Sequence, residues 1–229
     1  MPFEGFDFTN FWEESTYRAS YACGPLLPAV LAEAEKILGY KLPASYVRLM
    51  ERKNGGVPVN RAFPTKTPVS WAGDHIAIES IFGVGLNTPG CIVGETRLMV
   101  EEWGYPEIGV AICDCPSAGH DEVFLDYRAC GPQGEPKVVH IDQEDDYLIT
   151  PLADTFEEFN GDLVAGNPLN FPGYEEKLAE MRQKTGEKEG VVTGVAEIRG
   201  ERCVLAVMDG AFIMGSMGAA VGEKFARAV

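Results

Sequence analysis

A short stretch near the middle of the chain concentrates the residue types that could do chemistry. Cys113, Asp114 and Cys115 are consecutive, and His120 and Asp121 follow after a break of turn-forming residues. Zinc prefers thiolate and imidazole ligands, and its cysteines commonly have two to four residues between them. Only one residue separates the cysteines here. We therefore expect no metal site and no cofactor.

A cysteine–histidine nucleophile is a still weaker interpretation of the same stretch, because neither an oxyanion-hole motif nor a third orienting group can be named. His120 and Asp121 fall between two expected strands, in a loop, where recognition residues often lie. His75 and His140 have no such setting. We therefore predict surface binding and no catalytic residues. The predicted partner-binding residues are acidic or aromatic, with one histidine: Asp114, His120, Asp121, Asp126, Tyr127, Asp145 and Asp146.

A second stretch with chemical potential lies near the C-terminus. Gly215, Ser216, Met217 and Gly218 precede an expected helix over residues 219–229. A glycine-rich turn at the start of a helix presents backbone N–H groups to an anion or to a developing oxyanion.

The elements that position the central stretch are short apolar runs at residues 108–112, 123–127 and 138–141. They contain β-branched and aromatic residues and are separated by glycine, proline and serine, a pattern typical of antiparallel strands joined by hairpin loops. Apolar residues are nearly continuous in the first run, which indicates a strand buried on both faces. We predict a three-stranded meander.

Helices surround this meander in the sequence. Apolar residues recur at helical spacing over 25–39, a segment that ends in glycine, and again near 46–50, a segment that ends in Asn-Gly-Gly. Asp154 or Thr155 can cap a further helix with an apolar side. Beyond residue 173, the pattern predicts a helix over 174–184 and then two strands, 191–195 and 204–208, joined by a turn at Arg199 and Gly200.

Charge is distributed unevenly along the 229 residues. Residues 1–165 contain 26 acidic and 11 basic residues, whereas the remainder contains nine and eight, within a total net charge of −16. The acidic part should repel nucleic acid and favour a protein partner with a basic surface.

Other bulk properties favour a cytoplasmic globular protein. The chain is 45% hydrophobic and 24% charged, has no apolar run of about 18 residues and lacks a signal-peptide pattern at its start. We therefore expect no membrane association. Six scattered cysteines without CxxC pairs are expected to be inert thiols in a reducing compartment: Cys23, Cys91, Cys113, Cys115, Cys130 and Cys203.

Residues 10–165 resemble the SUKH superfamily, which includes Smi/Knr-type cell-wall regulators and bacterial immunity proteins. The resemblance rests on five motifs in order: LPASYVRLMERKNGG from Leu42, IESIF with its following glycines, 109–126, 136–144, and LADTFEEF from Leu152. It implies an α+β domain with a bent, mostly antiparallel sheet, helices packed on one side, and a binding function.

Residues 174–229 resemble an internal piece of the carboxyltransferase β subunit of bacterial acetyl-CoA carboxylase, which has a crotonase-like fold. The motifs are EKLAEMRQKTG, VVTG, VLAVMD and GSMGAAVGEKFARA. The resemblance implies a partial β-β-α fragment in which Gly215, Ser216, Met217 and Gly218 are vestigial acyl-CoA-binding positions. The family has a glycine where this chain has Met214, and its four-cysteine zinc ribbon is absent from the sequence.

These observations predict a SUKH-like binding domain over 1–166, a linker over 167–173 and a carboxyltransferase-like segment over 174–229. The expected function is that of a cytosolic immunity protein that neutralises a toxin. The alternative is a fragment or subunit of acetyl-CoA carboxylase, fused to a SUKH-like regulatory domain, with a carboxyltransferase α subunit as its partner.

Overall fold

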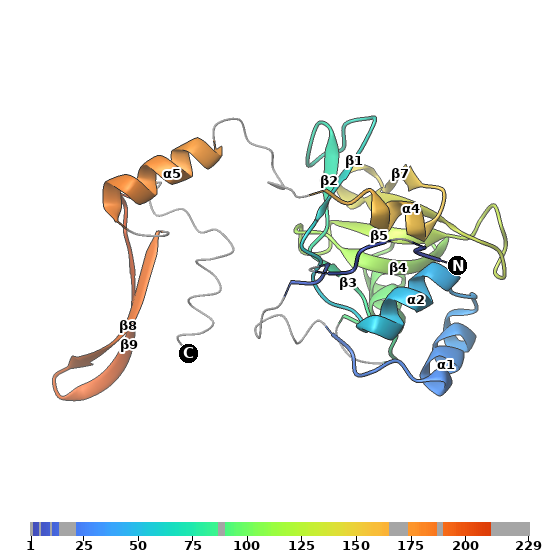
Figure 1. Ribbon diagram of the computed structural model, residues 1–229, viewed down its shortest axis with the longest axis horizontal. Coiled ribbons are helices and arrows are strands. Elements are labelled where there is room, and N and C mark those ends of the chain that lie inside the picture. Colours follow the sequence, from blue (N-terminus) through green and yellow to red (C-terminus); the bar gives the residue numbers. More distant parts are fainter. Residues whose placement is uncertain are drawn as a thin grey trace. The chain divides into compact units, whose positions relative to one another are not determined.

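The computed structural model describes residues 2–4, 6–9, 11–13, 22–86, 90–164, 174–186 and 190–211. The chain divides into two compact units, 1–169 and 170–229, and each is described here by itself (Figure 1). The predicted linker over 167–173 lies outside the described residues. Among the described residues, no helix is both long and apolar enough to cross a membrane.

An antiparallel sheet of five strands forms the centre of the first unit, and its strands are ordered as they occur in the sequence. They are β3 (Ser80–Ile81), β4 (Gly109–Asp114), β5 (Asp121–Asp126), β6 (Lys137–Asp142) and β7 (Leu148–Ala153). The predicted meander corresponds to β4, β5 and β6, and the sheet continues beyond it on both sides. We did not predict β7, because Pro151 interrupts its apolar pattern; proline is tolerated there because β7 is an edge strand.

Helices and a second, two-stranded sheet complete this unit. The small sheet pairs β1 (Ala62–Pro64) with β2 (His75–Ala77). The helices are α1 (Pro28–Leu38), α2 (Ala44–Arg52), α3 (Ile92–Arg97) with the π-helical turn η2 (Leu98–Glu102), the 3₁₀ turn η3 (Gln143–Asp145) and α4 (Phe156–Gly161). The predicted α+β class with antiparallel sheets is confirmed.

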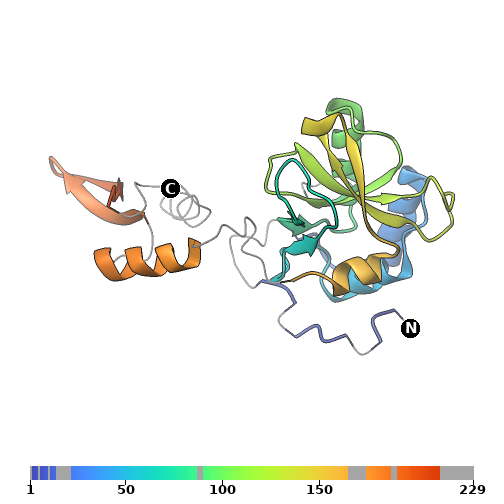
Figure 2. The same ribbon diagram turned by 90° about the horizontal axis from the view of Figure 1, so that it is seen from above.

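The core joins the sheet to α2 and α4, which lie side by side (Figure 2). Phe156 packs edge-on against Tyr46 with ring centroids 4.8 Å apart, and Phe159 stacks on Phe63 at 5.1 Å. All four aromatic side chains are buried. Thr155 caps α4, because its Oγ1 accepts a hydrogen bond from the Glu158 N–H at 3.2 Å. The predicted closing helix therefore contributes directly to the core.

The Asn-Gly-Gly sequence after α2 fixes a glycine turn that follows β3. The buried Asn54 side chain donates to the carbonyls of Gly24 and Val84 at 2.8 and 2.9 Å, and it accepts from the Val84 N–H at 2.7 Å. A Cβ on Gly83 would lie 2.5 Å from the Asn54 carbonyl oxygen, so a side chain there would push the two segments apart. The motif thus brings two distant parts of the chain together.

Cys23 and Cys91 form a disulfide across 68 positions of sequence. The prediction that all six cysteines are inert thiols is therefore wrong for this pair. The spacing of the cysteines in the sequence does not indicate this bond, because only folding brings the segment before α1 next to the start of α3.

The second unit contains α5 (Tyr174–Thr185) and a hairpin of β8 (Val191–Ile198) and β9 (Glu201–Met208). The strands pair in continuous register around Arg199 and Gly200, which both have positive φ. The hairpin exposes many large apolar side chains: Val192, Val195, Ile198, Val204, Leu205, Val207 and Met208. The glycine-rich turn at 215–218, Met214 and the predicted helix over 219–229 lie outside the described residues.

Candidate functional site

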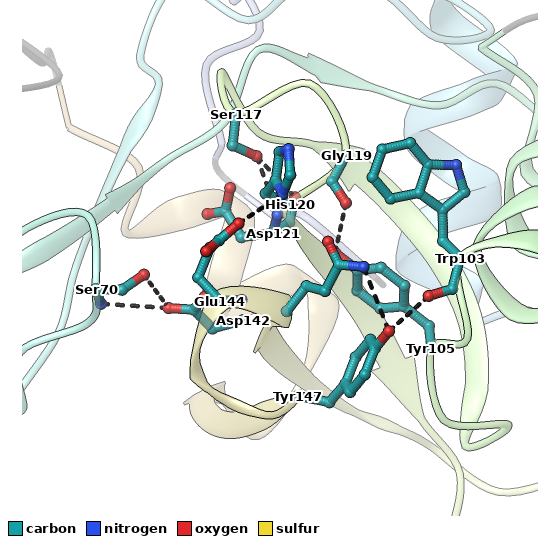
Figure 3. A network of polar contacts seen from close by, with 11 residues as sticks. Ser70, Trp103, Tyr105, Ser117, Gly119, His120, Asp121, Asp142, Glu144 and Tyr147 are labelled. Carbon is teal, nitrogen blue, oxygen red and sulfur yellow. Dashed lines mark hydrogen bonds and ion pairs between the residues drawn. The ribbon is translucent and has the colours of Figure 1, made fainter.

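The central stretch lies where three loops meet at one end of the large sheet. They are the β4–β5 loop (115–120), the β6–β7 loop (143–147) and the segment between η2 and β4 (103–108). Figure 3 shows the polar contacts that join them. Antiparallel pairing of β4, β5 and β6 brings the β4–β5 and β6–β7 loops to the same end, because alternate hairpin connections in a meander share an end of the sheet. The segment 103–108 contacts both loops through Trp103 and Tyr105 before it enters β4 at the opposite end of that strand.

Tyrosine hydroxyls tie the loops together. Tyr147 Oη donates to the Trp103 carbonyl at 2.6 Å and accepts from Gln143 Nε2 at 3.3 Å. Tyr105 Oη donates to the Gly119 carbonyl at 2.8 Å. These bonds link each loop to at least one neighbour, so the surface that they present is held in one arrangement (Figure 3).

Exposed carboxylates lie at the end of η2 and in the β6–β7 loop. We call Glu101, Glu102, Glu144, Asp145 and Asp146 the acidic rim; all five side chains are exposed. The bond between Tyr147 and Trp103 connects the segments on which they lie. This arrangement gives a surface of one sign, suited to a cationic partner.

His120 lies beside the rim and is 43% exposed. Its Nδ1 is 2.8 Å from Glu144 Oε1, and its ring meets the Trp103 ring edge-on at 5.7 Å. The predicted partner-binding residues His120, Asp145 and Asp146 therefore lie within reach of an incoming surface.

A mostly apolar cavity of about 250 Å³ adjoins the same loops. It lies under the segment that joins β1 to β2, and its walls include Val69, Trp71, Ile76, Pro116 and Asp121. Trp71 is 47% exposed at this position. An exposed aromatic side chain over an apolar cavity is typical of a residue that anchors a binding partner.

Two carboxyl groups beneath the loops are shielded from solvent. Asp114 Oδ1 accepts from the Ser80 backbone N–H at 2.6 Å and from the Ser80 hydroxyl, while burial raises the pKa of Asp114 to about 7. Burial also raises the pKa of Glu122 well above its usual range, and the nearby charge of Asp114 adds to this. Burial likewise raises the pKa of the Cys115 thiol. A high thiol pKa disfavours the thiolate that nucleophilic catalysis requires.

Two of the predicted partner-binding residues are not on the surface, which corrects the expectation that they are. Tyr127 is 2% exposed, stacks on Tyr40 and donates its hydroxyl to the Lys41 carbonyl at 2.7 Å. Asp121 is 4% exposed. The middle position of β5 in the sheet explains the burial of Asp121, because residues on both faces of this strand are buried. Tyr127 directly follows the same strand.

Asp114 and Asp126 are engaged within the protein. Arg128 contacts the Asp126 carboxylate at 2.7 Å. Although partial burial opposes the effect, hydrogen bonds from Arg128 and its charge lower the pKa of Asp126. Asp126 is thus already paired with a cation, whereas the rim residues Asp145 and Asp146 are exposed.

The residue that sequence reasoning missed is His140. Its side chain is fully buried and its Nε2 lies 2.7 Å from Asp121 Oδ2. The two residues are 19 positions apart in sequence, so spacing gave no indication of the contact. The register of β5 against β6 would have revealed it, because Val123 pairs with His140 and lies on the same face as Asp121.

Comparison with known families identifies the first unit. The model of the family SUKH_6, described as SMI1-KNR4 cell-wall, matches residues 29–159, which is more than half of the chain. The match includes the whole of the large sheet, α2, α3 and the Asn-Gly-Gly motif, together with α1 after its first residue and the first four residues of α4.

Curated relatives match a different part of the chain. They are acetyl-coenzyme A carboxylase carboxyl transferase subunits beta from Carboxydothermus hydrogenoformans (63% identical over 75 residues), Clostridium novyi (56% over 75) and Syntrophomonas wolfei (51% over 76). Each match covers 33% of this chain and 26–27% of the relative, so the chain spans about a quarter of the length of these proteins.

The length of these matches changes where the resemblance begins. A match of 75 residues is longer than the segment 174–229, so it includes residues before the predicted linker. A match of that length that ends at Val229 starts at Thr155, the cap of α4. The resemblance therefore extends beyond the residues 174–229 for which we predicted it.

Proposed function

Because the chain belongs to the SUKH_6 family of SMI1-KNR4 cell-wall proteins, we propose that its first unit is a protein-binding module of the immunity type. In this proposal it neutralises a toxin in the cytosol by covering part of the toxin's surface. The observation that carries the proposal is the acidic rim, held by the tyrosine network next to His120 and the Trp71 cavity. The toxin is a protein with a basic face that meets the rim and an apolar side chain that enters the cavity.

The acidic rim and the Trp71 cavity should contribute to different steps of binding, because the rim is exposed to solvent and the cavity is not once it is filled. Exposed carboxylates act over several ångströms through solvent, so they accelerate encounter and contribute little to the lifetime of a complex. The cavity excludes water once filled, so its contacts with Trp71 determine how slowly the partner leaves. The two surfaces should therefore affect different rate constants.

Binding kinetics test this proposal with a toxin encoded next to the gene of this chain. The double substitution Asp145→Lys and Asp146→Lys should lower the association rate constant by about tenfold or more and change dissociation less. Trp71→Ala should instead raise the dissociation rate constant. Association of the unaltered protein should slow between about 50 and 500 mM salt, because screening shortens the reach of the charges.

The matched control reverses charges far from the rim in sequence, at Glu33, whose side chain is 46% exposed, and at Asp162, which is also exposed. It changes net charge by the same amount as the rim variant, so a general charge effect would slow both equally. Equal slowing, or an association rate that salt leaves unchanged, would contradict the role of the rim. Failure of the chain to protect cells from any neighbouring toxin would contradict the immunity function itself.

A second candidate function follows from the high identity of the C-terminal part to carboxyl transferase subunits beta. In this alternative the chain is a fragment or subunit of acetyl-CoA carboxylase whose SUKH domain regulates carboxyl transfer from carboxybiotin to acetyl-CoA. The exposed apolar side chains of the β8–β9 hairpin support a segment that packs against further elements, as in a β-β-α piece of a crotonase-like fold.

We expect the chain to be inactive in this reaction, because it spans only about a quarter of the relatives and has Met214 where their family has glycine. A Cβ at that position can block close backbone approach to an acyl group. The assay follows carboxyl transfer to acetyl-CoA with a carboxyltransferase α subunit added. Turnover well above that of a Gly215→Val variant would establish the second function.

A further inference from the structure

Three potential metal ligands from separate segments converge beneath the loop that joins β1 to β2. Cys115 Sγ, a carboxylate oxygen of Asp121 and a ring nitrogen of His140 all lie within 4.8 Å of one another. Cys115 directly follows β4, Asp121 begins β5 and His140 lies within β6. Within the ranges that the structure describes, this is the one group of three or more His, Cys, Asp or Glu residues with such spacing.

The register of the sheet produces this convergence. Val123 pairs with Cys113 on one side and with His140 on the other. Two residues further along, the same antiparallel register places Cys115 opposite Asp121. Side chains two residues apart share a face, so Cys115, Asp121 and His140 project to the same side of the sheet, with Asp121 and His140 as diagonal neighbours.

The three side chains are buried, and some of their polar atoms have no hydrogen-bond partner among the described residues. Cys115, Asp121 and His140 are 2%, 4% and 0% exposed. Asp121 Oδ2 and His140 Nε2 contact each other at 2.7 Å, but Asp121 Oδ1 and His140 Nδ1 have no hydrogen-bond partner among the described residues. A buried polar atom without a partner is energetically costly, so such an atom usually has a function or a ligand.

We propose that Cys115, Asp121 and His140 bind a divalent transition-metal cation, with Zn²⁺ as the best-matched ion. Zn²⁺ takes sulfur, nitrogen and carboxylate ligands at about 2.0–2.3 Å, which places ligand atoms roughly 3.3–3.8 Å apart in a tetrahedral site. The spacing of the cluster requires only small side-chain adjustments to reach this geometry. Mg²⁺ and Ca²⁺ prefer oxygen ligands alone, so a set with a thiol and an imidazole selects against them.

Binding of the cation releases one proton, that of the Cys115 thiol. The Cys115 S–H bond breaks, its proton leaves to solvent, and the thiolate, the Asp121 carboxylate and the neutral His140 ring each donate a lone pair. Three protein ligands leave a fourth position, and Asp121 borders the Trp71 cavity from which water can supply it.

The same three residue types also occur in cysteine hydrolases, but the geometry here favours a metal. Cys115 is 2% exposed and is absent from the residues that line the cavity, so a substrate carbonyl cannot approach its sulfur. A small cation needs less room than a substrate carbonyl, and it can reach the cluster through Asp121, which borders the cavity. The ion would join the β4–β5 loop to β6.

The experiment uses the full-length chain, freed of metal with a chelator and handled without thiol reductant so that the Cys23–Cys91 disulfide is retained. Titration with Co²⁺ should show one equivalent bound, with a thiolate-to-cobalt charge-transfer band that disappears when Zn²⁺ displaces Co²⁺. The midpoint of thermal unfolding should rise as Zn²⁺ binds.

Cys115→Ser should abolish the charge-transfer band, whereas Cys113→Ser, which replaces a buried cysteine outside the cluster, should retain it. Asp121→Asn keeps the size of the side chain and should weaken Co²⁺ binding by more than about tenfold. If Cys115→Ser does not fold, the unaltered protein and Asp121→Asn decide. A missing charge-transfer band in the unaltered protein, or unchanged affinity in Asp121→Asn, would overturn the site.

Discussion

At the scale of single residues, Asn54 shows how a family motif acts physically. Its amide makes three hydrogen bonds that join the end of α2 to the segment before α1 and to the turn after β3. Asn54 is 5% exposed, so water cannot replace these bonds. An asparagine suits this position because one side chain supplies both the donors and the acceptor.

Asn54→Ala should therefore lower the free energy of unfolding by about 3 kcal/mol, since each lost bond contributes roughly 1 kcal/mol and its partners remain buried. Urea denaturation followed by tryptophan fluorescence measures this change. Asn60→Ala is the matched control, because Asn60 is only partly buried and its amide donates a single hydrogen bond, to the Leu163 carbonyl at 3.0 Å. We expect a loss of about 1 kcal/mol or less there. Similar losses in the two variants would show that Asn54 has no special role.

Residue identity was a poor guide to exposure in the central stretch. Asp145 and Asp146 are exposed at the β6–β7 turn, whereas Asp121, of the same residue type, is buried at the start of β5. Aspartate is rarely buried without a partner, so a surface position was the reasonable expectation for all three. The contact between Asp121 and His140 accounts for the exception.

At the scale of elements, α4 is the helix at which the SUKH_6 match ends. The SUKH_6 match extends to residue 159, and the carboxyl transferase match reaches back before the predicted linker. In the structure, α4 packs with the first unit through Phe156 and Phe159, both fully buried. The helix is therefore part of the SUKH core, whichever resemblance describes its sequence.

Two truncated chains test whether α4 is needed for the first unit to fold. A fragment that ends at residue 169 should unfold cooperatively, whereas one that ends at residue 154 loses two buried phenylalanines, each typically worth about 3–5 kcal/mol. That loss approaches the total stability of an ordinary domain, so the shorter fragment should be molten or aggregated. Circular dichroism in the near ultraviolet and thermal unfolding measure the difference. Equal cooperativity in the two fragments would mean that α4 is dispensable to the first unit.

At the scale of the whole molecule, the two units differ in how well they bury their apolar surface. The first has a continuous core of the large sheet, β1–β2 and the helices. The second exposes apolar side chains along both strands of β8–β9, and among its described residues the fully buried apolar side chain is Val191. A small β-hairpin with one helix buries too little surface to be stable alone. We propose that 1–166 and 174–229 are separate domains, with the second dependent on further elements.

The two parts of the chain also differ in net charge. Nearly all of the net charge of −16 belongs to residues 1–165, and the acidic rim displays part of it on one side of a single loop cluster. Negative charge spread evenly over the surface would repel acidic proteins, but it would not favour one orientation of a basic partner over another. Carboxylates clustered beside a cavity instead orient the basic face of a partner toward that cavity. For this reason we place the proposed binding site there.

The sequence by itself determined the local structure and the family of the first unit. Short β-branched and aromatic runs between turn residues located β4, β5 and β6, helical periodicity located α1, α2 and α5, and motifs in their order predicted the SUKH fold. These features depend on residues close together in the chain, where backbone preference and apolar period are sufficient. The edge strand β7 was not predicted, because Pro151 interrupts its apolar pattern.

Only the tertiary structure decided which distant side chains meet. The Cys23–Cys91 disulfide, the Tyr147–Trp103 bond and the Cys115–Asp121–His140 cluster each join segments whose separation carries no local signal. Strand register sets these contacts, and a shift of one residue would turn His140 to the opposite face of the sheet. Register depends on how the whole core packs, and for that reason no window of the sequence could specify it.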